Sequence, residues 1–412
     1  MTLTSVTGIH VLGKSAGIKA AGKKDLAVIY SEAPANVAGV FTTNKVKGAP
    51  VVLSIERLAK NRKCQAIVIN SGNSNVATGE QGMKDAVEMA RAAAYELGID
   101  EQYVLVSSTG IIGFPLPMQK IMDGLKGIKK DLSDEYSQTK DAAEDAAQSI
   151  MTTDTCTKQI AVKIKGITGT NSIANTITLA AMAKGSGMIH PNMATMLAFI
   201  ATDAEIGPSL LQKMLKTSVD KSFNMIAVDN DTSTSDSVYL MANGLKGKAD
   251  EKEFQKALDH VCIELAKMIA KDGEGATKLM EVIVKQAKTF EDAKKVAKSV
   301  ALSYLTKSAF GIMPIFGRVM AAAGYSGANI EPEKMDVYFG DEMVVNNGIK
   351  ADYDKQKINK ILKCEENNEG KECNKEKKIT ITINLNQGKE TATAWGCDLT
   401  KEYVDINAGY YT

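Results

Sequence analysis

The chain has 412 residues, of which 44% are hydrophobic and 24% are charged, and its formal net charge at pH 7 is +1. This composition is typical of a globular protein, and the length allows roughly two to three domains of ordinary size. The near-neutral charge argues against a broad nucleic-acid-binding surface or one that binds anionic lipid. No run of about 18 apolar residues is present, as a membrane span would require, and the first residues lack the pattern of a secretory signal. We therefore expect a cytoplasmic protein that binds neither nucleic acid nor membrane.

The cysteines and histidines are few and widely spaced, with six cysteines, three histidines and no C-x-x-C pair. A disulfide scaffold or a zinc site would need denser spacing, so we expect no metal. The shortage of histidine also disfavours a mechanism that depends on a histidine base. The sequence leaves open whether Cys364 and Cys373, which flank a polar loop, form a disulfide. The remaining four are expected to be small buried side chains: Cys64, Cys156, Cys262 and Cys397.

Short runs rich in Val and Ile, bounded by Gly, Asn or Asp, predict strands throughout the chain. They cover residues 26–30, 37–42, 65–70, 104–108, 160–164, 196–202, 225–228, 237–241, 335–339, 379–385 and 391–395. Apolar residues at helical spacing predict helices over 83–97, 254–268 and 290–304, the first of them ending at Gly98. This mixture predicts an α/β or α+β fold with sheets covered by helices. The segment 352–378 is charged and nearly free of apolar residues, which predicts a surface insert.

Residues 8–15 read G-I-H-V-L-G-K-S and formally fit the phosphate-loop pattern G-x-x-x-x-G-K-[ST]. That loop must follow a buried strand and open a helix, because backbone amides and the helix N-terminus hold the phosphates. Neither element is predicted here, and the four variable positions are mostly bulky and apolar. We interpret the match as accidental.

The most informative segment is 183–200, where a Gly-Ser-Gly loop and a proline turn lead into the apolar run that begins at Met196. Thr195 stands at the mouth of this predicted strand. A hydroxyl at the start of a rigid strand can act as a nucleophile. Spacing alone, however, favours a threonine that merely begins a strand.

Residues 184–197 read K-G-S-G-M-I-H-P-N-M-A-T-M-L and reproduce the segment K-G-[SA]-G-M-I-x-P-N-M-A-T-M-L. This segment is diagnostic of the ornithine acetyltransferases, the arginine-biosynthesis glutamate N-acetyltransferases that cut themselves at Ala-Thr, and the chain resembles that family from end to end. Further matching blocks lie at residues 24–27, 37–44, 70–73, 108–113, 152–155, 229–234, 273–278, 395–400 and 403–408.

The resemblance implies a self-cleaving enzyme with an N-terminal threonine nucleophile. Cleavage between Ala194 and Thr195 would give an N-terminal product of residues 1–194 and a C-terminal product of residues 195–412. The new α-amine of Thr195, with a reference pKa of about 7.7–8.0, could serve as the base for its own hydroxyl. Acetyl would pass from N2-acetylornithine to Thr195 and then to glutamate. The family's fold implies paired β-sheets covered by helices, and its cleaved chains imply an α2β2 assembly.

The resemblance also assigns individual roles. Thr109 and Gly110 match the pair that stabilises the oxyanion, and Glu274 is suited to a substrate ammonium. The substrate-binding positions carried over, besides Thr195 itself, are Thr152 (chosen over its neighbours in 152–155), Lys184, Glu274, Asn407 and Thr412. No cofactor is implied, and the sequence leaves open whether acetyl-coenzyme A serves as a co-substrate.

Two blocks depart from the family pattern: D-P-N-W-G-R is M-P-I-F-G-R at 313–318, and N-A-N-A is N-S-N-V at 73–76. These changes affect expectations about substrate preference but leave the nucleophile and the oxyanion pair intact. Two alternatives remain. An autoprocessed aminopeptidase or amidase would pass the acyl group to water, and the end-to-end match disfavours it. A catalytically silent amino-acid-binding relative is disfavoured by the retained Ala194–Thr195 junction.

Overall fold

A computed structural model of the protein describes residues 1–20, 22–167, 176–190, 196–363 and 377–409. The chain divides into two compact units, which are described separately. Unit 1 comprises Met1–Ser186, Asn192–Asp220 and Thr232–Leu265, and unit 2 comprises Gly187–Pro191, Lys221–Asp231 and Ala266–Thr412.

Unit 1 is built on one sheet, which has eight strands among the described residues. In spatial order they are β4 (Val104–Ile111), β3 (Lys63–Asn73), β2 (Leu26–Phe41), β9 (Ser237–Ala242), β7 (Leu197–Thr202), β6 (Thr176–Lys184) and β5 (Lys158–Lys165), with β1 (Ile9–Lys14) also paired to β2. Strands β9 and β7, which follow residue 195 in the chain, therefore lie between β2 and β6, which precede it.

The central strands of this sheet are buried on both faces. Successive residues of a strand point to opposite faces, yet Ile67, Val68 and Ile69 of β3 are all buried. Ile67 and Ile69 pack in a core with the alanines of helix α5 (Lys140–Ser149), and Val68 packs in a second core with helix α2 (Gly79–Leu97). This two-sided burial explains why the strands read as unbroken apolar runs in the sequence.

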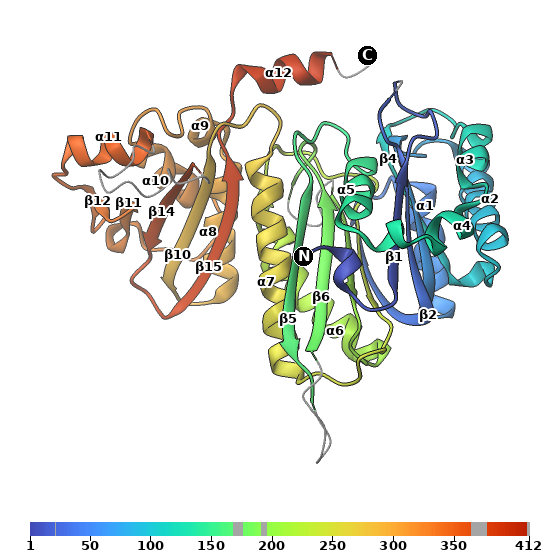
Figure 1. Ribbon diagram of the computed structural model, residues 1–412. Helices are drawn as coiled ribbons and strands as arrows, with labels where there is room; N and C mark the ends of the chain where they lie inside the picture. Colours follow the sequence, from blue (N-terminus) through green and yellow to red (C-terminus); the bar gives the residue numbers. More distant parts are fainter. Residues whose placement is uncertain (21, 168–175, 191–195, 364–376, 410–412) are drawn as a thin grey trace. The chain divides into compact units, whose positions relative to one another are not determined.

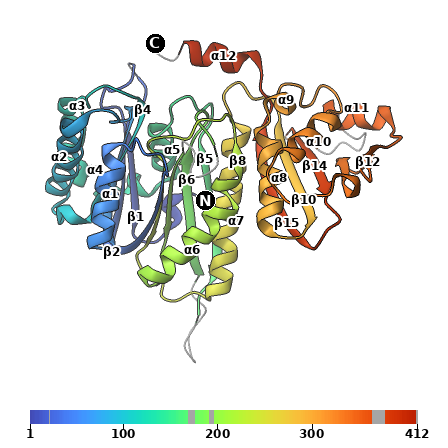
Figure 2. The same cartoon turned by 180° about the vertical axis from the view of Figure 1, so that it is seen from behind.

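The helices of unit 1 surround the sheet, as Figures 1 and 2 show. Helix α2 confirms the predicted stripe over 83–97, and Gly98 ends it in the left-handed conformation with φ +71°. The other helices are α1 (Ala49–Lys60), α3 (Met118–Leu125), α4 (Ile128–Ser133), α6 (Pro208–Lys221) and α7 (Glu251–Lys271), the last of which continues into the sequence of unit 2.

Unit 2 contains a second sheet. Its described strands follow the order β13 (Ile349–Lys350), β12 (Glu342–Asn346), β11 (Asp336–Phe339), β14 (Lys378–Asn384), β10 (Leu279–Ala287), β15 (Glu390–Cys397) and β8 (Ile226–Ala227). Helix α8 (Phe290–Leu302) lies along β10 and β15 (Figure 1). The remaining helices are α9 (Tyr304–Lys307), α10 (Phe316–Gly324), α11 (Lys355–Lys363) and α12 (Lys401–Ala408).

The prediction of a mixed fold with helix-covered sheets is thus confirmed, with local differences. The strands predicted at 26–30 and 37–42 are one strand, β2, whose pairing with β3 shifts register between Tyr30 and Ala35. The helix predicted over 290–304 ends at Leu302, because the Ser303 hydroxyl accepts the Thr306 amide and caps the next helix. Strands β1, β6, β10, β12 and β13 were not predicted.

Three sequence interpretations outside the site can also be compared with the structure. The segment that matches the phosphate-loop pattern forms strand β1, in agreement with an accidental match. The expectation that Cys156 is buried was wrong, because its side chain is exposed, whereas the other three cysteines expected to be buried are buried. The predicted surface insert includes helix α11, which buries Ile358 and Leu362, so this segment does contribute side chains to the core. Cys364 and Cys373 lie outside the described residues.

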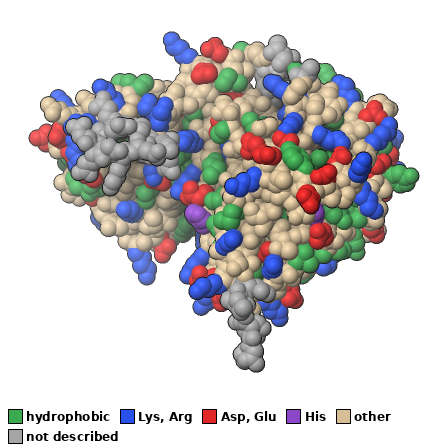
Figure 3. Space-filling view, in the orientation of Figure 1, with side chains coloured by type: hydrophobic (Ala, Val, Ile, Leu, Met, Phe, Trp, Pro, Cys, Tyr) green, Lys and Arg blue, Asp and Glu red, His purple; other side chains and the backbone are tan. Residues whose placement is uncertain are grey.

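The described surface carries mixed charge. On the face seen in Figure 3, basic and acidic side chains alternate, in keeping with the near-neutral composition. None of the helices in the described part of the chain is long and apolar enough to cross a membrane. Within the same residues, no three His, Cys, Asp or Glu side chains are grouped as a metal site would need.

Candidate functional site

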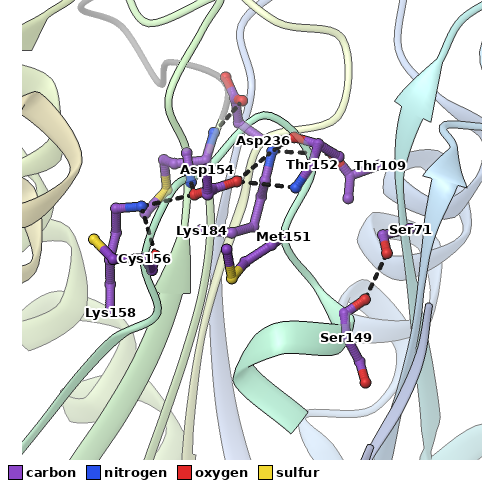
Figure 4. A network of polar contacts seen from close by, with 12 residues as sticks. Ser71, Thr109, Ser149, Met151, Thr152, Asp154, Cys156, Lys158, Lys184 and Asp236 are labelled. Carbon is purple, nitrogen blue, oxygen red and sulfur yellow. Dashed lines mark hydrogen bonds and ion pairs between the residues drawn. The ribbon is translucent and has the colours of Figure 1, made fainter. Parts of the chain in front are cut away.

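Three of the predicted site residues meet inside unit 1. Lys184 is the last residue of β6, and its side chain is buried. Its amino group donates to Thr152 Oγ1 at 2.7 Å and to Thr109 Oγ1 at 3.4 Å (Figure 4). Strand β6 thus carries a lysine across the sheet to a threonine at the end of β4 and to one in the loop after α5.

Gly110, the predicted partner of Thr109, is held where no side chain fits. Its φ is +133°, and a Cβ atom there would lie 2.4 Å from the carbonyl carbon of Gly72 and 2.5 Å from the nitrogen of Asn73. Strands β3 and β4 therefore approach closely at this point, which requires glycine. The end of β4 presents the Thr109 hydroxyl and a backbone amide side by side.

Asp154 organises this region, and the sequence analysis did not select it. Its Oδ1 accepts hydrogen bonds from Lys158 Nζ at 2.8 Å and the Gly185 amide at 2.6 Å, and its Oδ2 accepts the Thr152 amide at 3.0 Å. Lys184 Nζ lies 3.9 Å from Oδ2. Burial alone would raise the pKa of this carboxyl, but the charges of Lys184 and Lys158 outweigh burial and hold the pKa well below its usual range. Asp154 is therefore ionised at neutral pH.

Lysines and carboxylates lie close together in the polar centre of unit 1. Lys158 and Lys184 are both buried, and Asp154 lies within ion-pair distance of each of them. Lys19 adds a third cation: its amino group donates to the carbonyls of Lys24 and Met151, and burial lowers its pKa to about 8, with Asp25 opposing this effect and Lys184 adding to it. Ammonium groups gathered in such a centre suit an anionic group of a ligand.

The predicted cleavage site, Ala194 and Thr195, lies outside the described residues, but its C-terminal neighbour does not. Met196 is buried at the entrance to β7, and its amide donates to Asp236 Oδ1 at 3.0 Å. Asp236, directly before β9, is fully buried. Burial raises the pKa of its carboxyl well above the usual range, against the effects of the hydrogen bonds from Met196 and Ser233 and the charge of Lys184.

Two further predicted residues meet within unit 2. The Asn407 side-chain amide donates to Glu274 Oε2 at 2.7 Å, and Glu274 is 8% exposed. Gly187 packs directly on this carboxylate, since a Cβ atom on Gly187 would lie 2.3 Å from Glu274 Oε1. The second glycine of the Gly-Ser-Gly loop is therefore required by the position of Glu274. Thr412 lies outside the described residues.

The surroundings of Glu274 in unit 2 are acidic. Asp229 accepts the Met188 amide at 2.8 Å and the Tyr403 hydroxyl at 3.2 Å. Burial raises the pKa of the Asp229 carboxyl, and the negative charges of Asp231 and Glu274 raise it further. Burial and Asp229 also raise the pKa of Tyr403. This field favours a cationic ligand group at Glu274.

Asp154 and Asp236 are the site residues that sequence reasoning missed. Asp154 lies in the block 152–155, which carried the family resemblance, whereas Asp236 lies two residues after the block 229–234. For Asp236 the available signal was an acid directly before the strand predicted at 237–241, because an acid that is buried there needs a partner or a shifted pKa.

Comparison with known proteins decides the family. The model of the ArgJ family matches residues 10–412. The chain belongs to this family. Arginine biosynthesis bifunctional protein ArgJ of Symbiobacterium thermophilum is 47% identical over 420 residues, covering 100% of this chain and 98% of that protein. The Thermotoga neapolitana ArgJ protein is 47% identical over 403 residues, with 95% of each chain covered. The family predicted from the sequence is thereby confirmed.

Solved ArgJ structures were also matched. The crystal structure of the Bacillus halodurans ArgJ protein has 40% sequence identity and a TM-score of 0.47, and covers 52% of this chain and 98% of that one. The Mycobacterium tuberculosis ornithine acetyltransferase, solved with ornithine, has 32% identity and a TM-score of 0.38, and covers 46% of this chain and 94% of that one.

Proposed function

We propose that this ArgJ protein moves the acetyl group of N2-acetylornithine to glutamate through an acetyl-Thr195 intermediate, releasing ornithine and N-acetylglutamate in arginine biosynthesis. The observation that carries the proposal is the buried contact of Lys184 with Thr109 and Thr152, in a chain of the ArgJ family. This buried ammonium group lies beside two hydroxyls and Asp154, an arrangement suited to binding an anionic group.

The reaction begins with self-cleavage. The Thr195 hydroxyl attacks the carbonyl carbon of Ala194, the C–N bond breaks, and water opens the resulting ester. The freed α-amine of Thr195 can be partly neutral near pH 7, so it accepts the proton of its own hydroxyl in each later transfer step. This arrangement needs no histidine.

Each transfer passes through a tetrahedral oxyanion, for which we assign Thr109 and Gly110 as donors. Because Lys184 donates a hydrogen bond to Thr109 Oγ1, the proton of the Thr109 hydroxyl remains available to the oxyanion. The Gly110 amide is the second donor. Loss of one such donor typically lowers the rate on the order of 100- to 1,000-fold.

Charge supports two binding roles. The buried ammonium group of Lys184 suits the α-carboxylate that N2-acetylornithine and glutamate share, with Thr152 holding the lysine in place. Glu274, in its acidic surroundings, suits the side-chain ammonium that only ornithine carries. We keep Asn407, which contacts Glu274, and Thr412 as further substrate-binding residues.

A second activity is favoured by the names of the relatives, which are called bifunctional. We propose that acetyl-coenzyme A can also acetylate Thr195, so that the enzyme makes N-acetylglutamate without N2-acetylornithine. Measuring acetyl transfer to glutamate from both donors side by side tests this directly. Transfer from N2-acetylornithine alone would leave only the first activity.

Self-cleavage and the nucleophile are tested together by Thr195→Ala. The variant should run as one band on a denaturing gel and transfer no acetyl, whereas the wild type should give two bands whose masses correspond to 1–194 and 195–412. Thr195→Ser should still cut, since it keeps the hydroxyl. A single wild-type band would favour a silent binding protein, and release of free acetate without transfer to glutamate would favour a hydrolase.

We further propose that the two products stay together as an α2β2 assembly in the cytoplasm. The family match supports this assembly, and native mass spectrometry of the cleaved protein tests it. A species with one copy of each product would contradict the α2β2 form.

A further inference from the structure

Lys19 joins two loops that are far apart in the sequence, and the proposed function gives it no role. Its amino group donates to the carbonyl of Lys24 at 3.0 Å and to the carbonyl of Met151 at 2.7 Å. An amino group carries at least two N–H donors in either protonation state, so both bonds can form whether or not the lysine is charged. Met151 directly precedes Thr152 in the chain. Lys19 therefore contacts the backbone that carries a proposed substrate-binding residue.

The loop that carries Lys19 is itself held in place. Asp25, a buried acid directly before β2, accepts the Ala16 amide at 2.6 Å through Oδ1. Its Oδ2 accepts the amides of Ile18 at 2.6 Å and Lys19 at 2.9 Å. The stem of the Lys19 side chain packs on Gly72, since a Cβ atom there would lie 3.1 Å from Lys19 Cγ. Backbone and side chain are thus both fixed, so the amino group is presented in one position.

Lys19 and Asp154 hold opposite edges of one peptide group. The Met151 carbonyl and the Thr152 amide belong to the same planar unit, because the C–N bond between them has partial double-bond character. Lys19 donates to the oxygen of this unit. Asp154 Oδ2 accepts its N–H at 3.0 Å, as Figure 4 shows. With both edges bonded, the plane is held against rotation, and the Thr152 hydroxyl stays 2.7 Å from the amino group of Lys184.

We propose that Lys19 is a positioning residue of the α-carboxylate site and acts through the peptide group between Met151 and Thr152. This role rests on the proposed function, in which Lys184 binds the α-carboxylate and Thr152 holds the lysine. Lys19 keeps the Thr152 hydroxyl against Lys184, so the site is aligned before a substrate enters. Because N2-acetylornithine and glutamate share the α-carboxylate, Lys19 serves the binding of both substrates more than the chemical step.

The test is a double-mutant cycle in the full-length protein, with Lys19→Met, Thr152→Val and the two changes combined. Steady-state kinetics with N2-acetylornithine and with glutamate gives KM and kcat for each protein, and urea unfolding gives its stability. Lys120→Met is the matched control, because Lys120 also donates to a carbonyl of the Lys19 loop, that of Gly17 at 2.6 Å, but does so from an exposed side chain.

Lys19→Met should raise KM for both substrates about 10-fold, with kcat near the wild-type value and Lys120→Met unaffected. In the Thr152→Val background the same change should raise KM less than about twofold, because the hydroxyl that Lys19 positions is gone.

An equal rise of KM in both backgrounds would overturn the proposal, since Lys19 would then act elsewhere. Lower stability of Lys19→Met with unchanged KM would also overturn it and leave Lys19 a purely structural role. Should Lys19→Met misfold, Lys19→Gln, which also removes the amino group, carries the same expectations. A wild-type protein that transfers no acetyl from N2-acetylornithine to glutamate would instead refute the proposed function and, with it, this role.

Discussion

The amino group of Lys184 lies 2.7 Å from the hydroxyl oxygen of Thr152, and the backbone on both sides of this contact is held by one carboxylate. Asp154 accepts the amide of Thr152 and the amide of Gly185, the residue after Lys184. The lysine and the threonine therefore cannot shift independently. Such double attachment is how a rigid site keeps a charged group aligned with a ligand.

Replacing Lys184 should weaken the recognition of both substrates, because both carry an α-carboxylate. We expect Lys184→Met to lower kcat/KM for N2-acetylornithine and for glutamate by about 10- to 150-fold, the range of a buried charge-assisted hydrogen bond. Steady-state kinetics with each substrate measures this. Lys163→Met, at an exposed position of β5, is the control and should behave as wild type. Loss of activity toward one substrate only would argue against carboxylate recognition.

Glu274→Gln tests whether Glu274 binds the ammonium group of the acetyl donor, N2-acetylornithine. Self-cleavage should be retained, because it involves no ornithine, and Gln can still accept the hydrogen bond of Asn407. Transfer from N2-acetylornithine should fall about 10- to 150-fold, corresponding to roughly 1.5–3 kcal/mol. Glu291→Gln, at an exposed position on α8, serves as control. Cleaved Glu274→Gln protein with unchanged turnover and KM would remove Glu274 from substrate binding.

Gly187→Ala should reproduce the defect of Glu274→Gln without altering any charge. The added methyl group would overlap the Glu274 carboxylate at 2.3 Å, so this side chain has to move. We expect KM for N2-acetylornithine to rise on the order of tenfold, a loss of about 1.4 kcal/mol. Gly317→Ala in α10, where no atom lies within 4 Å of the added carbon, is the matched control. Equal kinetics in both variants would show that Glu274 tolerates displacement.

Asp154 should make the free energy of unfolding depend on pH in the acidic range. Its pKa in the folded state is depressed, so the ionised carboxyl stabilises the fold above the ordinary value of about 3.9, and this contribution is lost as the pH falls below that value. Asp154→Asn should lower the free energy of unfolding at neutral pH by about 3–5 kcal/mol, since Lys158 and Lys184 lose their counter-charge.

Urea unfolding of the wild type and of Asp154→Asn at several pH values measures this difference. The gap between the two proteins should narrow on acidification below about pH 4. Asp123→Asn, which changes an exposed ion pair with Lys126, should leave stability unchanged. A gap that is constant with pH would mean that Asp154 acts by shape and not by charge.

The order of substrate binding follows from the acetyl-Thr195 intermediate. Ornithine must leave before glutamate enters, so double-reciprocal plots at several glutamate concentrations should be parallel. Mass spectrometry of protein mixed with N2-acetylornithine alone should show one added acetyl group on the 195–412 product. Intersecting lines without an acetylated product would require direct transfer between bound substrates.

Much of the fold could be predicted because burial dictates the sequence pattern. The unbroken apolar run of β3 and the apolar stripe of α2, which ends at Gly98, can each be recognised within one short stretch of sequence. Strand β6 was missed because its buried residues include alanine and threonine, which indicate no strand by themselves. Its burial comes from its neighbours β5 and β7, which local sequence does not reveal.

The candidate site was predictable in part for the same reason. Thr109, Thr152 and Lys184 were selected through motif resemblance, and the structure brings them together. Asp154 was not selected, since its importance depends on lysines four and thirty residues away in the chain that only folding places beside it. Asp236 was not selected because its contact with the Met196 amide joins residues 40 positions apart, which only folding brings together.

The order β2–β9–β7–β6 has a consequence for the lifetime of the cleaved protein. After a cut at residue 194, the C-terminal product would contribute β9 and β7, each hydrogen-bonded on its outer side to a strand of the N-terminal product. The halves could then separate only by melting the middle of the sheet. Dilution would not dissociate them, and molecules with labelled and unlabelled halves would not exchange partners. Cleavage would release a chain end for catalysis, while the two products would separate only as slowly as an uncut chain unfolds.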